Sequence, residues 1–150
     1  MKITFKGDYA LKAVLDLSIN AGRPEKIEDI ARRQDIPLKF LEQILLALKK
    51  GGFVRSVRGR KGGYALARLP EKITMGEVIR YIEGPTEPIS CIAKTGETHC
   101  NYAAQCVFRD VFLDIGKYIN NKIDQLTFAK LKDLSAKKMA QKKGTLDYCI

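Results

Sequence analysis

The stretch KKGGFVRSVRGRKGGYALARL, residues 49–69, decides the fold that this sequence predicts. Residues 49–72 contain eight basic side chains and one acid. Apolar side chains alternate with polar or small ones over 53–57 and 64–68, which is the period of two short strands with one buried face. Three glycines between these segments permit positive φ and a tight turn. We therefore expect a β-hairpin with a cationic tip.

Three cations, Arg58, Arg60 and Lys61, crowd the tip of the predicted hairpin. Like charges this close repel one another unless an anion neutralises them. The phosphate backbone or the minor groove of a DNA duplex supplies such an anion. The hairpin is therefore predicted to be a DNA-binding wing.

Three helices are predicted ahead of the hairpin, over residues 8–20, 27–34 and about 38–50. Their apolar residues recur at the three- and four-residue steps of a helix with one buried face. On the third helix the buried stripe is expected to consist of Leu41, Ile44, Leu45 and Leu48. Two short helices joined by a tight turn and followed by a hairpin form a winged helix-turn-helix, here a DNA-binding domain at residues 1–83.

The sequence beyond the hairpin predicts a further helix over 73–82, with Thr74 as its N-cap and Glu77 as the reciprocal partner. Helical periodicity then fails, and prolines, glycine and threonines mark residues 84–106 as a loop. A loop of this length in a small domain is usually functional or disordered. Because three cysteines lie in it, we expect a sensor loop.

Apolar residues recur at helical spacing from Val107 to Leu126. A helix about 30 Å long with a continuous apolar stripe is too long for the small core described so far. We therefore expect a dimerisation helix that packs on its own copy, and the alternative is a helix lying across its own domain. The predicted dimerisation region is 107–136, which includes a shorter helix, and 137–150 is predicted to be a flexible basic tail. The predicted buried residues of the shorter helix are Phe128, Leu131 and Leu134. The predicted fold class is mostly α (α+β), a winged helix-turn-helix with a long C-terminal dimerisation helix.

The net charge of +10 comes from 27 Lys and Arg against 17 Asp and Glu. Residues 1–83 hold 17 of the cations and 10 of the acids, which favours a nucleic acid or another anionic partner. No apolar stretch approaches the ~20 residues of a membrane span, and the N-terminus lacks the apolar core of a signal peptide. We expect a cytoplasmic protein without a membrane partner, in a compartment where disulfides are rare.

Four residues of the third helix, outside its apolar stripe, are candidates for reading DNA: Lys39, Phe40, Glu42 and Gln43. A recognition helix contacts base edges mainly through residues near its N-terminus. Lys39 can contact phosphate or guanine, Gln43 can bond adenine through both amide atoms, and Glu42 can accept from cytosine or repel phosphate. The alternative is an ordinary solvated helix face.

Three cysteines, Cys91, Cys100 and Cys106, have the spacing C-x8-C-x5-C. This spacing lacks the C-x2-C pairs of zinc ribbons and ferredoxins. Buried thiols, a zinc site and a redox disulfide are all alternatives, although a polar loop suits core thiols poorly. Soft thiolates on a loop suit either an iron–sulfur cluster or zinc, and the chemistry alone does not choose between them.

Four segments carry a more specific signal: KGDYAL at 6–11, FLEQI at 40–44, VRGRKGGY at 57–64 and GEVI at 76–79. Together they resemble the IscR/NsrR-type winged-helix regulators of the Rrf2 family, over residues 1 to about 135. The resemblance implies a homodimeric bacterial transcription factor that binds a double-stranded DNA operator. It also implies that the recognition helix enters the major groove and that Arg58 reaches the minor groove.

The resemblance further implies an iron–sulfur cluster, with a 2Fe–2S centre favoured over a 4Fe–4S centre, held by Cys91, Cys100 and Cys106. IscR-like members have a histidine three residues after the last cysteine, where this sequence has Arg109. NsrR-like members use an aspartate of the second subunit, which matches Asp8. His99, the single histidine, is the alternative fourth ligand, and Cys149 is expected to be a free thiol.

These implications combine into one expected function, a regulator whose operator affinity is controlled by the cluster through redox state, nitric oxide or iron–sulfur supply. Two alternatives remain open: a regulator of the same fold that senses a metabolite or a partner enzyme, and an iron–sulfur or zinc carrier. We expect neither an enzyme nor a small-molecule substrate, because one histidine and no nucleophile motif leave the chain without an evident general base.

Overall fold

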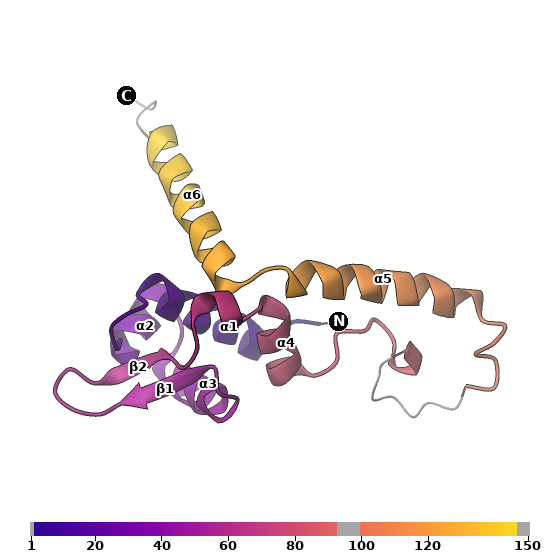
Figure 1. The fold of residues 1–150 in the computed structure, drawn as a ribbon, viewed down its shortest axis with the longest axis horizontal. Helices are drawn as coiled ribbons and strands as arrows, with labels where there is room; N and C mark the ends of the chain where they lie inside the picture. Colours follow the sequence, from indigo (N-terminus) through magenta and orange to yellow (C-terminus); the bar gives the residue numbers. More distant parts are fainter. Residues whose placement is uncertain (1, 93–99, 147–150) are drawn as a thin grey trace.

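A compact winged body carries two helical arms in the computed structural model, which describes residues 2–92 and 100–146 (Figure 1). The elements in chain order are α1 (Phe5–Ile19), α2 (Ile27–Gln34), α3 (Leu38–Lys50), β1 (Val54–Val57), β2 (Gly63–Leu66), η1 (Pro70–Lys72), α4 (Met75–Glu83), η2 (Ser90–Ile92), α5 (Val107–Asp124) and α6 (Phe128–Leu146). The mostly helical winged helix-turn-helix prediction is confirmed. Over the two described ranges, no helix is both long enough and apolar enough to cross a bilayer.

The core of the winged body lies between α1 and α3. The predicted stripe of α3 is confirmed, since its four residues are all buried: Leu41, Ile44, Leu45 and Leu48. Ala10, Val14 and Leu17 of α1 are buried in the same cluster. Helix α1 begins at Phe5, three residues before its predicted start, because the Thr4 hydroxyl accepts a hydrogen bond from the Lys6 amide at 3.2 Å and caps the helix.

The turn of the helix-turn-helix is made by one left-handed residue. Asp35 has φ 51°, and the amide of the next residue, Ile36, donates to Ala31 O at 3.0 Å. Ile36 is buried in the core cluster. Aspartate tolerates the left-handed region better than most residues, so the chain can reverse here and start α3 after Pro37.

The hairpin pairs β1 with β2 in antiparallel register, from Val54 opposite Leu66 to Val57 opposite Gly63. The base of β2 also pairs with the segment before α2, because Glu25 and Tyr64 exchange two backbone hydrogen bonds of 2.8 Å. Gly63 has φ 152°, and any Cβ there would overlap the backbone of Glu25. The close approach that this glycine permits is therefore to the chain's own backbone at Glu25.

A buried ion-pair cluster joins α1, α2 and the segment that pairs with the hairpin. The Arg33 guanidinium donates to Asp16 Oδ2 and to Glu25 Oε2, both at 2.7 Å. These carboxylates are only 2% and 6% exposed. Gln34 adds a bond of 3.0 Å to Asp16 Oδ1. The hydrogen bond to Asp16, with a further contribution from Glu25, raises the pKa of Arg33, so this side chain is always charged.

Helix α4 begins with the predicted capping box. The Thr74 hydroxyl accepts from the Glu77 amide at 3.2 Å, and the Glu77 carboxylate accepts from the Thr74 amide at 2.9 Å. Each group thus satisfies a helix-start donor that would otherwise have no acceptor. The cap confirms the predicted pairing and moves the helix start to Met75.

The contacts of the winged body include residues beyond 83, where the sequence predicts the end of the DNA-binding domain. The Met75 amide donates to Leu126 O at 2.8 Å, and the Phe128 amide donates to Ile73 O at 2.9 Å. Phe128 is fully buried among the core residues, and Leu131 packs against them. The start of α6 therefore completes the DNA-binding domain. The sequence did not predict this packing, because helical periodicity shows which face of a helix is apolar but not which part of the protein that face covers.

Helix α6 differs from its prediction in length as well. The sequence predicted a helix shorter than the preceding one, ending near residue 136, yet α6 runs to Leu146 and has 19 residues against 18 in α5. The residues from 136 to 143 are Ala, Lys, Met and Gln. All four types have high helix propensity, so the basic composition that suggested a frayed tail is equally suited to a helix.

We expect Arg33→Ala to destabilise the domain by roughly 3 kcal/mol, because it leaves two buried carboxylates without their shared cation. Arg32→Ala is the matched control, since Arg32 makes an exposed pair with Asp29 at 2.8 Å, and should cost less than about 1 kcal/mol. Urea unfolding of both variants measures the difference. Equal midpoints for the two variants would show that the cluster does not hold the fold.

Candidate nucleic-acid interface

The four predicted reading residues of α3 all lie on its solvent-exposed face: Lys39, Phe40, Glu42 and Gln43. Phe40 is 61% exposed although it is aromatic. The buried stripe on the opposite side of α3 anchors the helix, so this face stands outward on a rigid support. The structure thus brings these residues together at the N-terminal half of α3, where a recognition helix contacts bases.

The cationic tip of the hairpin is also as accessible as predicted. Arg58, Arg60 and Lys61 are exposed, and within the described ranges none of them has a hydrogen-bond or ion-pair partner. Gly59 has φ 111°, which turns the chain between two of these cations. The tip therefore concentrates positive charge that the described part of the chain does not neutralise.

A side-chain bond links the reading helix to the hairpin. Lys49 at the end of α3 donates to the hydroxyl of Ser56 in β1 at 2.7 Å. This bond is one direct contact between the reading helix and the first strand of the wing. The sequence analysis counted Lys49 only as part of the basic stretch, because the pairing depends on how the chain reverses at Gly51 and Gly52.

An aromatic surface that the sequence analysis missed borders the reading face. A hollow of about 380 Å³ lies between α1 and α3, and its lining residues are Phe5, Lys6, Tyr9, Phe40, Gln43 and Ile44. The rings of Phe5 and Tyr9 are 6.1 Å apart, and Phe5 is 80% exposed. The start of α1 therefore flanks the surface that carries Phe40. The spacing of Phe5 and Tyr9, one helical turn apart, was a signal for a shared face.

Asp8 lies on the first turn of α1 next to this surface. Its carboxylate accepts from Lys12 Nζ at 2.7 Å, one turn along the helix. The hydrogen bond to Asp8 raises the pKa of Lys12. The predicted fourth cluster ligand is thus accessible and is paired with a lysine in the single chain.

The start of α1 is held by the last residue of α4. Glu83 accepts from the Thr4 amide at 3.0 Å and from the Thr4 hydroxyl at 2.6 Å. The bond from the Thr4 hydroxyl lowers the pKa of Glu83. A Cβ at Gly7 would overlap the same carboxylate. Since the cysteine-bearing segment starts directly after Glu83, that segment is connected to α1 through this contact.

The three predicted cysteine ligands lie apart along the segment between α4 and α5. Cys91 belongs to η2, Cys106 is the N-cap of α5, and Cys100 is exposed between them; all three are free thiols. η2 packs near Gly116, because a Cβ there would lie 3.7 Å from Ile92 Cδ1. Ten residues of α5, about 15 Å of helix, separate Gly116 from Cys106.

The cysteines are therefore not gathered in this arrangement. Within residues 2–92 and 100–146, no three His, Cys, Asp or Glu side chains are placed to hold a metal ion. The three thiols have the right chemistry to bind an iron–sulfur cluster. The segment that carries them would have to close around the cluster to do so. Two predicted residues, His99 and Cys149, lie outside the described residues.

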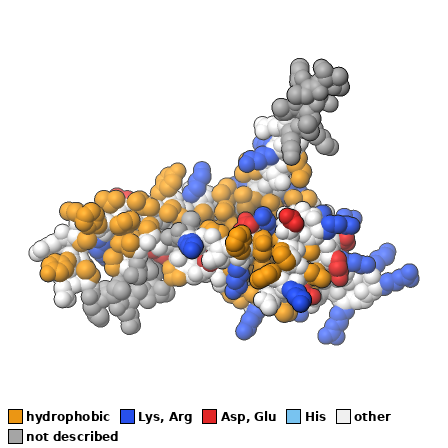
Figure 2. All heavy atoms as spheres, turned by 180° about the vertical axis from the view of Figure 1, so that it is seen from behind, with side chains coloured by type: hydrophobic (Ala, Val, Ile, Leu, Met, Phe, Trp, Pro, Cys, Tyr) orange, Lys and Arg blue, Asp and Glu red, His pale blue; other side chains and the backbone are white. Residues whose placement is uncertain are grey.

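In the described residues, the side-chain hydrogen bonds that tie α5 to α4 and to Thr86 lie in its C-terminal part. Asn120 accepts from Arg80 at 2.9 Å and from the Thr86 hydroxyl at 2.6 Å, and Arg80 also bonds Asp124. The first two thirds of α5, residues 107–118, extend from the body, and the exposed apolar residues there are Val107, Phe108, Val111, Ile115 and Tyr118. Figure 2 shows the apolar side chains along this arm and the Lys and Arg side chains spread over the winged body.

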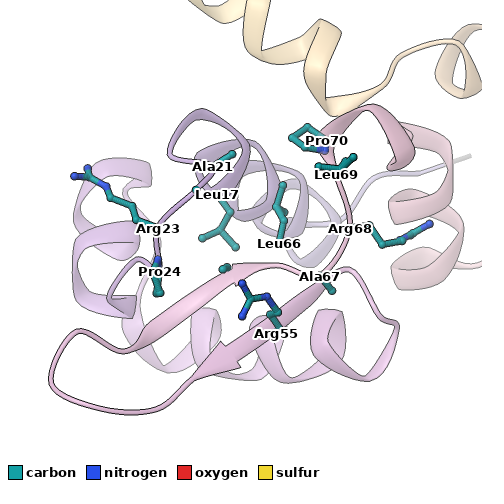
Figure 3. Close-up of a pocket in the computed structure, with 12 residues that line it drawn as sticks. Leu17, Ala21, Arg23, Pro24, Arg55, Leu66, Ala67, Arg68, Leu69 and Pro70 are labelled. Carbon is teal, nitrogen blue, oxygen red and sulfur yellow. The ribbon is translucent and has the colours of Figure 1, made fainter.

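A second groove lies beside the hairpin, between β2, η1 and the end of α1 (Figure 3). Its volume is about 330 Å³. Leu17 and Leu66 point into it, whereas the guanidinium groups of Arg23 and Arg68 point outward. Arg68 stacks on Phe53 with 5.1 Å between its Cζ and the ring centroid and bonds Glu77 at 3.2 Å. The groove offers apolar contact rather than a cluster of charges.

Comparison with known proteins identifies the architecture. Residues 3–134 match the family model of Rrf2, iron-dependent transcriptional regulators. The chain belongs to the Rrf2 family. The resemblance stated from the sequence is thereby confirmed, and the chain is a DNA-binding transcriptional regulator and not an enzyme.

Individual Rrf2 relatives cover most of the chain. It is 40% identical over 141 residues to an rrf2-like HTH-type regulator of Rhodobacter capsulatus, covering 89% of this chain and 92% of that one. It is 36% identical over 132 residues to IscR of Aliivibrio salmonicida, covering 87% and 77%.

Solved structures of the Rrf2 family superimpose well. CymR of B. subtilis has a TM-score of 0.77 at 30% identity, covering 89% of this chain and 98% of that one. T. potens IscR has a TM-score of 0.74 at 33% identity, covering 94% and 91%. The winged body and both helical arms are therefore a family architecture.

We expect Arg58→Ala to weaken operator binding by roughly 1–3 kcal/mol if the side chain reads a base or a narrow groove. Fluorescence anisotropy with a selected operator measures the loss, and Arg58→Lys is the control that keeps the charge but not the planar fork. If Arg58 contacts phosphate alone, the lysine variant should bind like the wild type. Unchanged affinity of Arg58→Ala would remove the hairpin tip from the interface.

Proposed function

We propose that this Rrf2 regulator is a homodimer that reads an operator with α3 and the hairpin, and whose affinity is controlled by an iron–sulfur cluster. The observation that carries the DNA-binding part is the fixed pairing of two accessible surfaces. Lys49 bonds Ser56 at 2.7 Å, so the reading face of α3 and the unpaired cations of the hairpin are presented together. A duplex offers adjacent major and minor grooves that such a pair of surfaces can enter. Because a bacterial transcriptional regulator acts on the chromosome, we expect this one to lie in the cytoplasm.

The dimer is proposed to form through α5. Five large apolar side chains between Val107 and Tyr118 are exposed, and Phe108 and Tyr118 are 68% and 71% accessible. Contiguous apolar surface of this kind usually marks an interface. A second copy of the same helix can cover it in a symmetric pair, since each copy presents the same stripe. This arrangement would also set the distance between the two reading helices.

The cluster is proposed to be held by Cys91, Cys100 and Cys106, with Asp8 of a second copy as the fourth ligand and His99 as the alternative. Support comes from the free thiols, from the accessible Asp8 carboxylate and from relatives named IscR. A 2Fe–2S centre is favoured over a 4Fe–4S centre. When bound, such a group supplies a centre that responds to oxidants, nitric oxide or iron–sulfur supply.

The residues of this chain would carry the response to the DNA-binding face. Cys91 and Cys106 must approach each other to bind the same cluster, so the segment after Glu83 has to shift. Glu83 holds the start of α1 through Thr4, and the same helix carries Asp8 and packs against α3. A shift of the segment can therefore move α1 and change the separation of the two reading helices in the dimer. Because half-site spacing is set by the DNA helix, a small rotation changes affinity.

A second candidate function is sensing without a cluster, by thiols, a metabolite or a partner protein. The observation that favours it is the TM-score of 0.77 with CymR, which is described as the global cysteine regulator of B. subtilis. The separated thiols are compatible with this alternative as well. A carrier function has no comparable support, because the relatives are named as regulators.

We expect protein purified without oxygen to be coloured and to contain iron and sulfide. Cys100→Ser should lose the visible absorption because it removes a ligand, whereas Cys149→Ser is the matched control and should keep it. Asp8→Ala and His99→Ala separate the two candidates for the fourth ligand, and the variant with the altered spectrum identifies it. A colourless wild-type protein would favour the thiol or metabolite alternative.

We expect cluster-loaded and cluster-free protein to differ in operator affinity, because the ligands connect the segment after Glu83 to α1. Anisotropy titrations of both forms at one salt concentration measure the difference. A duplex of unrelated sequence is the control. If the two forms bind the operator equally, the cluster does not gate DNA binding, and the DNA-binding function itself is unaffected.

A further inference from the structure

A basic hollow of about 390 Å³ lies between α2 and the tip of the hairpin. Its lining includes five cations, Arg23, Lys26, Arg32, Arg33 and Lys61, and two carboxylates, Glu25 and Asp29. Four of these cations belong neither to the reading face of α3 nor to the hairpin. The hollow is thus a separate concentration of positive charge beside the candidate interface.

The two carboxylates of the hollow are already satisfied within the chain. Glu25 accepts from Arg33 at 2.7 Å and from Arg23 at 2.8 Å, and Asp29 accepts from Arg32 at 2.8 Å. Lys26 and Lys61 are exposed, and their side chains have no hydrogen-bond or ion-pair partner in the part of the chain that is described. Arg33 also pairs with Asp16, so five positive charges stand against three negative charges and leave an excess of two, which favours an anionic partner.

We propose that this hollow seats the sugar–phosphate backbone of the bound duplex, through Lys26, Arg32 and Lys61. The inference rests on the proposed reading of adjacent grooves by α3 and the hairpin. One backbone strand separates a major groove from the neighbouring minor groove, so a protein that enters both must pass over phosphates. Lys61 belongs to the hairpin, and α2 leads through a short turn into α3, so the hollow is lined by the hairpin and by the helix that precedes the reading helix.

Contacts of this kind set the position of the protein on DNA without reading its sequence. Lysine and arginine that neutralise phosphates release bound counterions, and the affinity then depends steeply on salt. The hollow should therefore contribute equally to operator and non-operator binding. This separates its role from that of Gln43 or Phe40, whose loss should change the sequence preference.

The test measures how the affinity for a fluorescein-labelled duplex of mixed sequence changes with salt, for wild type, Lys26→Ala and Arg32→Ala. Each variant should reduce the slope of log affinity against log salt by about 0.9, the value for one phosphate contact. Both should weaken operator and non-operator duplexes by the same factor. Lys132→Ala is the control, because Lys132 is exposed on α6, which leaves the body on the side away from the hairpin (Figure 1), and its slope should equal that of the wild type.

Three outcomes would overturn the inference, and they are distinguishable. Slopes that are unchanged in both variants while the wild type binds would remove the hollow alone from the interface. A wild type that binds no duplex even in dilute buffer would remove the proposed DNA contacts altogether. If inorganic phosphate at constant ionic strength raises the melting temperature of the wild type but not of Lys26→Ala, with equal DNA slopes, the hollow is a site for a small anion instead.

Discussion

The bridge made by Arg33 is the constraint on which the winged body depends. Its guanidinium joins Asp16 of α1 to Glu25, and both carboxylates are almost excluded from water. Charges in such a place are tolerated only when paired, so α1, α2 and the segment before α2 have to remain in one arrangement. Glu25 also exchanges backbone hydrogen bonds with Tyr64. The bridge therefore sets the position of the hairpin relative to the helices, which any reading of adjacent DNA grooves requires.

The charges outside this bridge are arranged differently. The two buried carboxylates, Asp16 and Glu25, share the Arg33 cation, whereas the cationic side chains of the hairpin tip and of Lys26 have no partner in the described residues. A folded protein gains little from holding unpaired cations together, since they repel one another. Their concentration beside the exposed face of α3 is explained by a polyanion that arrives from outside. Phe40 lies on the exposed face of α3, and its ring can make apolar contact with a thymine methyl group.

The segment with the cysteines lies along the chain between two sets of polar contacts. Glu83 bonds Thr4 at one end, and the C-terminal half of α5 is tied to α4 through Arg80 and Asn120 at the other. Between these anchors the thiols are separated by much of the length of α5, so ligand binding and folding of the segment would be coupled. Because the segment is connected to α1 and α4 in this way, its closure around a ligand can shift the helices that position α3.

The sequence by itself determined the winged body and the identity of its exposed residues. The stripe of α3, the capping box at Thr74 and the cationic hairpin followed from periodicity and from local hydrogen-bonding rules, which act over a few residues and can be read without coordinates. The tertiary structure alone decided which distant residues meet. Phe128 closes the core of the first domain, Lys49 bonds Ser56, and Lys26 faces Lys61 across a hollow, although no spacing rule connects these pairs. The sequence also did not reveal that the three cysteines are separated. Their separation depends on where η2 packs along α5, and the intervals between the cysteines in the sequence do not determine that position.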